Sequence, residues 1–347
     1  MENITKGDIY HKEIFEKILN EGCLDKWPRP HYEDVFTESH YDPERKELWT
    51  PAGVYKIGDN QQVFEEGDTI KVWTPAHTLS VNEGIECTYN LSKGESPLIT
   101  LRNIAVKNAI AELFWIYQKQ SNDLVVFDEL LGKKTWDENH EINNWWKDWA
   151  IRDENGDYVL NSEGHPTIGT CYGETIRRHG LVDKLLEEMQ KNPDGRRHII
   201  SMWQEDDFKE PHGLKPCAFM TIWNIRHGKD GEDYLDMTLV QRSSDFATAG
   251  CINQVQYSVL VELFAKHLGI KPGYFTWKPV NVQIYDRHME QAKEMLRRDS
   301  IPCTPYFEIV NESSDFFDIN PQDVQLKGYP REKIKEMNPQ LKFPLGI

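Results

Sequence analysis

The thiol of Cys217 is the side chain in this sequence that could most directly form a covalent bond with a substrate. It follows Lys215 and Pro216 and stands at the entrance to an apolar run. A cysteine attacks as its thiolate, so it needs a nearby cation to stabilise that form. The alternative is a small buried core residue, which is the commoner place for a single cysteine.

Two polar stretches further along the chain could bind the substrate of such a nucleophile. Arg242, Ser243 and Asp245 directly follow an apolar, strand-like run, and an arginine beside hydroxyls suits a phosphate. A solvated strand end with a surface ion pair explains the same pattern equally well. Asn253 opens a helix, where its amide could pair with the O4 and N3–H edge of a uracil ring or could cap the helix.

Glu112 is a candidate for proton transfer because it lies in the most apolar helical stretch, residues 103–120. Burial there would desolvate its carboxylate and raise its pKa, which suits it to that role. A glutamate at the helix edge, facing water, is the weaker alternative, since the neighbouring residues are apolar on nearly every face.

Both helices and strands must position these residues. Helical periodicity predicts helices over residues 9–21, 103–120, 181–191, 253–268 and 286–298. Alternating runs predict strands around 77–81 and over 197–203, 219–225, 235–240, 274–282 and 306–310, with a hairpin turn at 227–231. Helices and strands are intermixed without repeats. This pattern indicates one α+β domain with a mixed, largely antiparallel sheet packed with helices.

Composition narrows the class of protein and its partners. The 347 residues carry 40 basic and 57 acidic side chains, a net charge of -17, so we expect no nucleic-acid partner. The six cysteines are spread along the chain without a CxxC pair, which argues against a disulfide scaffold and a zinc site, and we expect no metal. We find no signal peptide and no stretch of the roughly 18 apolar residues that span a membrane. We therefore expect a cytoplasmic protein with no membrane partner.

Taken in order along the chain, these stretches resemble the thymidylate synthase family. The matching segments are residues 75–81, 97–100, 111–115, 146–149, 172–173, 193–200, 215–217, 241–245, 253, 285–288 and 342–347. Each motif alone is weak, but so many matches in one order are specific. The resemblance implies a thymidylate synthase-like catalytic domain over residues 74–347. Residues 1–73 would hold an N-terminal helix and an irregular extension that is atypical of the family.

The resemblance also implies a reaction, namely the reductive methylation of dUMP to dTMP. The co-substrate would be 5,10-methylenetetrahydrofolate, which leaves as dihydrofolate. Cys217 would be the nucleophile that adds to C6 of dUMP, and Arg242 would lower the pKa of its thiol. Glu112 and Tyr172 would be the proton-transfer residues.

The binding residues follow from the same resemblance. Those matching the nucleotide site are Arg242, Ser243, Asn253, Gln283 and Tyr285, together with Arg196 and Arg197 from the neighbouring subunit, which implies a homodimer with shared active sites. Those matching the folate side are Trp146, Trp149, Asp245 and the C-terminal Ile347, which belongs to a tail that closes over the ligands.

The sequence departs from the family pattern around the nucleotide. The family's phosphate-binding loop arginine is missing from the aligned residues 66–71, where Lys71 could substitute as a point charge. Gln283 replaces a sugar-binding histidine, and Ala218 stands where many members have histidine. Two alternatives therefore stay open. One is a pyrimidine-nucleotide hydroxymethylase of the same superfamily, in which water rather than hydride completes the reaction. The other is a non-catalytic nucleotide-binding relative. Asn253 favours uracil, because the cytosine enzymes resemble this family with aspartate at that position.

Overall fold

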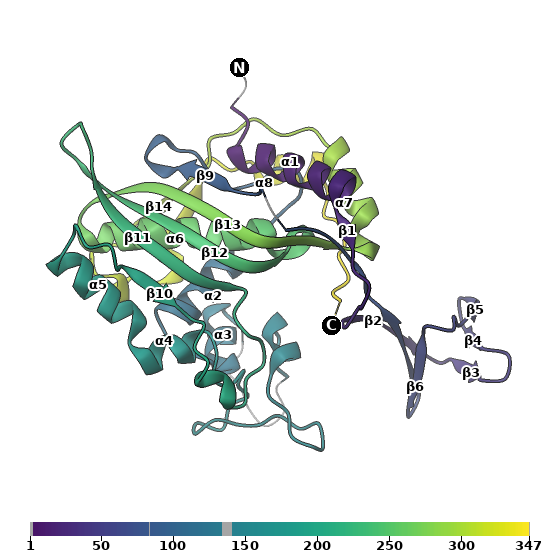
Figure 1. The fold of residues 1–347 in the computed structure, drawn as a ribbon. Helices are drawn as coiled ribbons and strands as arrows, with labels where there is room; N and C mark the ends of the chain where they lie inside the picture. Colours follow the sequence, from purple (N-terminus) through teal and green to yellow (C-terminus); the bar gives the residue numbers. More distant parts are fainter. Residues whose placement is uncertain (1–2, 83, 134–140, 347) are drawn as a thin grey trace.

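A mixed sheet forms the centre of the molecule (Figure 1). The structure is a computed structural model that describes residues 3–82, 84–133 and 141–346. Within these residues the sheet has seven strands: β1 (Cys23–Leu24), β8 (Thr78–Val81), β9 (Cys87–Asn90), β10 (Ile199–Ser201), β11 (Ala218–His227), β12 (Asp233–Asp245) and β13 (Lys271–Tyr285). Their order is β1-β8-β13-β12-β11-β10, and β9 pairs with the first half of β13.

One pair of neighbouring strands, β12 and β13, is parallel, whereas the other pairs in this sheet are antiparallel. The predicted α+β class with a mixed, largely antiparallel sheet is therefore confirmed. The predicted hairpin is also present, as β11 and β12 joined through Gly231, whose φ of 84° suits a glycine turn. The strand predicted over 274–282 is longer than expected, because β13 begins at Lys271 and the Pro272-Gly273 step does not interrupt it.

Helices cover the sheet and carry part of the site. They are α1 (Lys6–Glu21), α2 (Val106–Tyr117), α3 (Leu124–Leu130), α4 (Gly173–His179), α5 (Leu181–Lys191), α6 (Cys251–Leu268), α7 (Met289–Arg297) and α8 (Arg331–Met337). Helix α6 packs against β12 and β13, and α2 packs on α6, so both are almost wholly buried. This double packing explains why their sequences are apolar on most faces.

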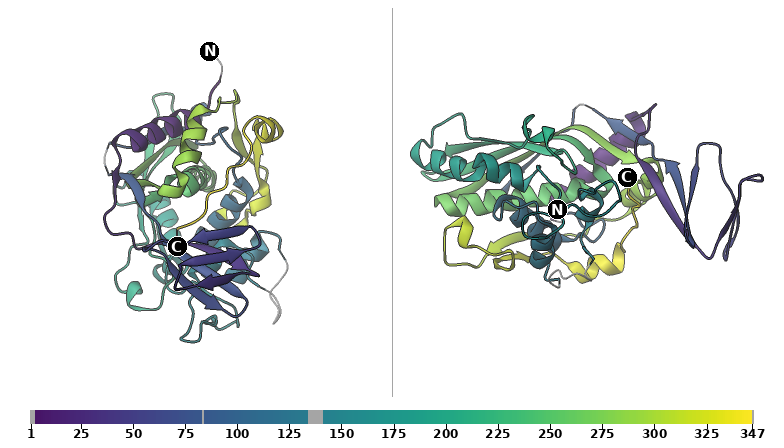
Figure 2. Two further views of the ribbon diagram at one scale, coloured as in Figure 1. Left: turned by 90° about the vertical axis from the view of Figure 1, so that its right-hand side faces the viewer. Right: turned by 90° about the horizontal axis from the view of Figure 1, so that it is seen from below.

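Residues 31–75 form an arm that projects from the body of the molecule (Figures 1 and 2). The arm holds two three-stranded sheets, β2 (His31–Thr37), β7 (Thr69–Pro75) and β6 (Gln62–Glu66) in one, and β3 (His40–Asp42), β4 (Glu47–Thr50) and β5 (Gly53–Lys56) in the other. They enclose a small separate core of Leu48, Ile57, Ile70 and Val72. The extension is therefore more regular than the sequence indicates. The domain division between residues 73 and 74, which falls inside β7, stays a prediction.

The arm is fastened to the body close to the end of β13. The hydroxyl of Tyr32 donates to Asp286 Oδ1 at 2.6 Å, and the Arg287 guanidinium lies 4.0 Å from the centre of the Tyr32 ring. Arg287 also forms two hydrogen bonds with Asp34, at 3.1 and 3.0 Å. Because the Arg287 guanidinium is stacked on a ring and also makes two parallel hydrogen bonds, it fixes the orientation of the arm better than a single ion pair would. A short two-stranded sheet of β14 (Tyr306–Ile309) and β15 (Val324–Lys327) completes the fold.

Candidate active site

The parallel pairing of β12 and β13 brings the predicted residues together. The carboxyl ends of parallel strands meet at the same edge of a sheet. Ser243 is therefore paired with Asn281 and Asp245 with Gln283, and Tyr285 lies two residues beyond. After β12 the chain enters α6, whose first turn carries Asn253. Residues separated by about 40 positions thus share one end of the sheet.

Cys217 immediately precedes β11, next to an irregularity in the pairing of β11 with β12 between Ala218 and Met220. Such bulges redirect side chains at the edges of functional sites. Arg242 is held against the backbone just before the cysteine, since its Nε donates to Pro216 O at 2.9 Å and an Nη donates to Lys215 O at 2.8 Å. Burial raises the pKa of the Cys217 thiol, and the charge of Arg242 lowers it by less. Arg242 thus acts in the predicted direction without outweighing burial.

Tyr172 contacts the nucleophile directly. Its hydroxyl oxygen accepts the backbone N–H of Cys217 at 3.1 Å, and burial raises the pKa of this phenol. Tyr172 has φ 47° and ψ -111°, in a region that non-glycine residues rarely adopt. Strained backbone of this kind costs about 1–3 kcal/mol and persists where the surroundings enforce it, often at functional sites. The Tyr172 ring packs against that of Trp146, with 5.0 Å between the ring centres.

Glu112 is buried in α2 and its carboxylate accepts hydrogen bonds from three side chains. Trp145 and Trp146 donate their indole N–H groups to Oε1, and Gln256 donates to Oε2 at 2.6 Å. Burial raises the pKa of Glu112 and the three donors lower it, with a net rise. The predicted desolvation is therefore present, and a raised pKa suits a carboxyl group to proton transfer.

Asn253 does not act as a helix cap but lies between two glutamines. Gln241 donates to Asn253 Oδ1 and Asn253 donates to Gln256 Oε1, each at 3.1 Å. These bonds occupy one acceptor position of Oδ1 and one N–H of Nδ2, whereas an asparagine amide has two of each. One N–H and one oxygen lone pair remain for a ligand in the adjoining cavity.

One carboxylate oxygen of Asp245 accepts a hydrogen bond, whereas the other is buried and has no partner among the described residues. Its Oδ2 accepts from the Thr248 hydroxyl at 2.5 Å, whereas Oδ1 makes no hydrogen bond with any described residue. The nearest cationic candidate is Nδ1 of the buried His288, 3.9 Å away. Burial raises the pKa of the carboxyl group. Asp245 also lines the cavity, and a buried oxygen without a partner carries a desolvation cost that no hydrogen bond offsets.

The C-terminal tail lies across the same site. His288 Nε2 donates to Pro344 O at 2.6 Å, and the Arg102 guanidinium lies 5.2 Å from the centre of the Phe343 ring. These contacts bring Leu345 and Gly346 to the cavity wall. Ile347, predicted to close over the ligands, lies outside the described residues.

These side chains line one cavity of about 560 Å³. The predicted residues in its wall are Glu112, Trp146, Trp149, Tyr172, Cys217, Arg242, Ser243, Asp245, Asn253, Gln283 and Tyr285. The chain's own Arg196 and Arg197 are exposed and do not line it. Lys71 does not line it either, because it lies in the arm and pairs with Glu66 at 2.7 Å. The suggestion that Lys71 replaces the loop arginine at this cavity is therefore wrong for the described structure.

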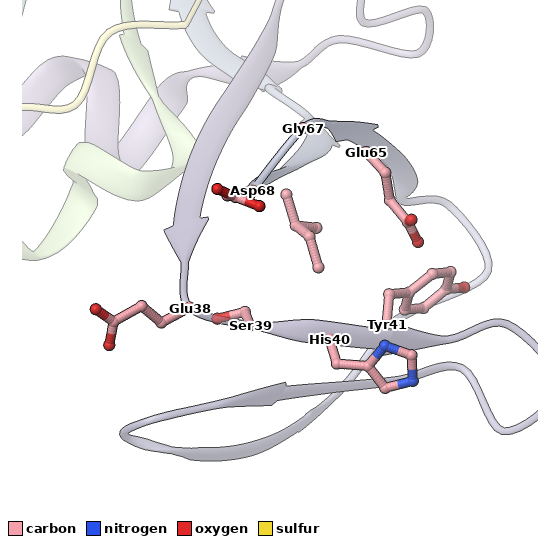
Figure 3. A pocket seen from close by; sticks show the side chains of 8 residues that line it. Glu38, Ser39, His40, Tyr41, Glu65, Gly67 and Asp68 are labelled. Carbon is pink, nitrogen blue, oxygen red and sulfur yellow. The ribbon is translucent and has the colours of Figure 1, made fainter.

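A smaller hollow of about 320 Å³ lies between the two sheets of the arm (Figure 3). Glu38, Glu65, Asp68 and His40 are among its lining residues, and none of the predicted catalytic residues is. Over residues 3–82, 84–133 and 141–346, no group of three or more His, Cys, Asp and Glu side chains is arranged to hold a metal ion. In the same residues, no helix is both long and apolar enough to cross a membrane.

Sequence reasoning missed several residues of the site. Gln241, Gln256 and Trp145 all line the cavity, and the last two bond to Glu112. Gln256 could have been found, because it stands three positions after Asn253 and so shares its helix face. Gln241 and Trp145 directly precede the predicted site residues Arg242 and Trp146, but their local sequence does not indicate that they belong to a hydrogen-bond network.

Comparison with known proteins gives one consistent result. The family model described as thymidylate synthase matches residues 59–340. A thymidylate synthase of Lactococcus lactis subsp. cremoris (strain SK11) is 43% identical over 261 residues, covering 75% of this chain and 84% of the relative. One from Streptococcus pneumoniae (strain 70585) is 37% identical over 345 residues, covering 99% of this chain and 100% of the relative. The solved structure of thermostable thymidylate synthase A from Bacillus subtilis superposes with a TM-score of 0.70 at 25% identity, covering 98% of this chain and 99% of that one.

Proposed function

The chain belongs to the thymidylate synthase family, and on that premise we propose that the cavity beside Cys217 is its active site. The reaction is the reductive methylation of dUMP to dTMP. In it, 5,10-methylenetetrahydrofolate supplies both the one-carbon group and the hydride. The observation that best supports the placement is the convergence of Cys217, Arg242, Glu112 and Asn253 on one cavity from four separate elements. The hydroxymethylase and the non-catalytic relative are not favoured, because the matching relatives are thymidylate synthases across nearly the whole chain.

Cys217 adds to C6 of dUMP, and the residues around it make this step possible. Since burial raises the pKa of the thiol, the thiolate forms only with help from Arg242 and from the substrate's own electron demand. The addition places negative charge on O4 and C5 of the ring. Asn253 has a free N–H that can stabilise charge at O4, and a preorganised donor in a water-poor cavity is effective there.

Proton transfer at C5 falls to Glu112 and Tyr172. Glu112 lines the cavity, and its raised pKa makes it a better proton acceptor than an exposed carboxylate. Tyr172 is held in place through its bond to the Cys217 backbone. Both groups lie on the side of the cavity lined by Trp145 and Trp146, which keep water away.

The rest of the wall divides between the two substrates. Arg242 and Ser243 face the phosphate, while Gln283 and Tyr285 contact the sugar at the ends of β12 and β13. The carboxylate of Asp245, in the cavity wall, accepts from the N–H groups of a pterin. Trp149 and Trp146 supply flat apolar surface for the folate, and the tail at Leu345 and Gly346 covers the ligands.

Arg196 and Arg197 complete the phosphate site of a second subunit in a homodimer. They are exposed in this chain, next to β10. On β13 the buried Phe275 and Trp277 alternate with Tyr274 and Val280, which are 40% and 53% exposed. Thr276 and Lys278 lie on the same outward face, and an uncovered sheet face of mixed character suits an isologous interface with a second copy. A reduced, cytoplasmic location suits the catalytic thiol, and all six cysteines are free.

The test is to incubate the protein with dUMP and methylenetetrahydrofolate, following dihydrofolate by absorbance and the nucleotide by mass. We expect dTMP and dihydrofolate in equal amounts. Cys217→Ser should abolish turnover while dUMP still binds, and the matched variant Cys23→Ser, at an exposed cysteine away from the cavity, should retain it. A hydroxymethylated product without dihydrofolate, or full turnover by Cys217→Ser, would overturn the proposal.

A further inference from the structure

The C-terminal tail, residues 342–346, is held against the body by side chains that follow the end of β13. His288 Nε2 donates to Pro344 O at 2.6 Å, and Gln291 Nε2 donates to Lys342 O at 3.0 Å. Because a carbonyl oxygen can only accept, Nε2 of His288 must carry the hydrogen of its bond. The docked tail therefore selects one tautomer of neutral His288, in which Nδ1 has no hydrogen.

This second ring nitrogen of His288 faces the carboxylate of Asp245. Nδ1 lies 3.9 Å from Asp245 Oδ1, and both atoms are buried without a hydrogen-bond partner among the described residues. His288 is 0% exposed, so bulk water does not reach the pair. With the tail docked, a neutral imidazole and an ionised carboxylate present one acceptor to another, and neither is satisfied. One proton between the two atoms would satisfy both.

Release of the tail removes this conflict without an added proton. Once Pro344 O no longer accepts from Nε2, neutral His288 can carry its single hydrogen on Nδ1 and donate it to Asp245 Oδ1. The two atoms must then approach by about 1 Å, since N–H···O bonds measure about 2.7–3.2 Å. The docked state thus needs one more proton at this pair than the released state, so docking is favoured at low pH and weakens as the pH rises.

The surroundings of the pair favour uptake of that proton. Burial raises the pKa of the Asp245 carboxyl group, and the hydrogen bond from the Thr248 hydroxyl lowers it by less. The charges of His288 and of Arg102, which precedes α2, lower this pKa by smaller amounts. The Tyr285 ring, at the end of β13, packs edge-on against His288 with 5.5 Å between the ring centres.

We propose that His288 is a positioning residue that couples docking of the tail to Asp245, and that the docked state holds one proton shared between Nδ1 and Oδ1. The proton comes from solvent and returns to it when the tail leaves. As an imidazolium, His288 donates to both Pro344 O and the carboxylate, which fixes the direction of Asp245 in the cavity wall. The consequence for turnover rests on the proposed function, in which Asp245 binds the folate and the tail covers it.

The test measures how fast trypsin cuts after Lys342 in the full-length protein, followed by mass as loss of the last five residues. The initial rate reports the fraction of undocked tail. Asp245→Asn supplies an amide that can donate to Nδ1 of neutral His288, so its tail should dock without an added proton. Dividing the wild-type rate by the Asp245→Asn rate removes the pH dependence of trypsin itself. We expect this rate ratio to be about 1 at about pH 6 and about 10 at about pH 8.5, the effect of one unmade buried hydrogen bond.

Variants of two neighbouring residues separate coupling through His288 from a general loosening of the tail. His288→Gln can still donate to Pro344 O but has no atom in place of Nδ1, so the rate ratio should not change with pH in that background. His288→Asn has an amide near the position of Nδ1 and cannot reach Pro344 O, and it should abolish the pH dependence as well. Gln291→Met is the matched control, because Gln291 bonds to Lys342 O rather than to Asp245. Its tail should be cut faster, but the rate ratio should rise with pH as in wild type.

Cooperative unfolding in urea selects the folded variants for this comparison. A rate ratio that is independent of pH in the wild-type background would overturn the coupling, as would an equal rise in folded His288→Gln or His288→Asn protein. The KM of Asp245→Asn for 5,10-methylenetetrahydrofolate tests the proposed function separately. An unchanged KM would show that Asp245 does not bind the folate, while the cleavage rates would still decide the coupling.

Discussion

Arg196 and Arg197 offer the sharpest test of how the active site is assembled, because this chain's own copies do not reach its cavity. They are exposed beside β10, while the phosphate end of the cavity holds Arg242 and Ser243. If they act across a dimer, Arg196→Ala/Arg197→Ala should impair the partner's site. Loss of hydrogen bonds to a charged group costs about 1.5–3 kcal/mol each, so the double variant should lose roughly a hundredfold or more in kcat/KM.

Mixing this variant with Cys217→Ser should restore activity by a predictable amount. A heterodimer has one site with an intact Cys217 and the partner's intact arginines, and one site in which both are broken. Random exchange of subunits makes about half of the dimers heterodimers. The mixture should therefore recover about one quarter of the wild-type activity per site, and purified heterodimer about one half. Arginines that acted within their own chain would leave every site broken.

The assay uses two affinity tags, so that heterodimers can be purified and their composition verified before turnover is measured. Arg297→Ala is the matched control, since Arg297 is exposed and pairs with Glu294 on its own helix. It should retain full activity alone and should not alter the recovery. A verified heterodimer no more active than its two parents would refute shared sites and place Arg196 and Arg197 outside the catalytic machinery.

Three further predictions concern single side chains. Asn253→Asp should lower dUMP affinity at least tenfold more than dCMP affinity, because a carboxylate cannot donate to O4; nucleotide titrations with equal losses would contradict this. Tyr172→Phe should lower kcat by about a hundredfold or more with dUMP binding retained, which steady-state kinetics would test against an unchanged kcat. Burial raises the pKa of Glu262 from its ordinary 4.5 to about 7, so its stabilising, neutral form prevails at low pH and is lost as the pH rises through about 7. Glu262→Gln should therefore have a higher free energy of unfolding than wild type at about pH 8, by at most about 3 kcal/mol, and a similar one at about pH 4, which urea titrations at the two pH values would measure.

The sequence predicted the local parts of this site and not their connections. Cys217 and Arg242 stand out because each lies where an apolar run meets polar residues, a pattern that marks the end of a strand. That β12 and β13 are parallel neighbours could not be derived from either run alone, since register and direction depend on tertiary packing. Lys71 was misplaced for the same reason. Its alignment suggested a phosphate site, whereas strand pairing sets it opposite Val35 and Phe64 in the arm.

The departures from the family pattern become intelligible when the site is treated as one network. Ala218 and Gln283 stand where imidazoles are expected, and an imidazole changes its charge and hydrogen-bonding pattern near neutral pH. The amides of Gln241 and Gln256 do not titrate, and their direction is fixed by an indole at one end and a carboxylate at the other. The direction of these hydrogen bonds is therefore set by geometry and does not depend on the protonation of a histidine.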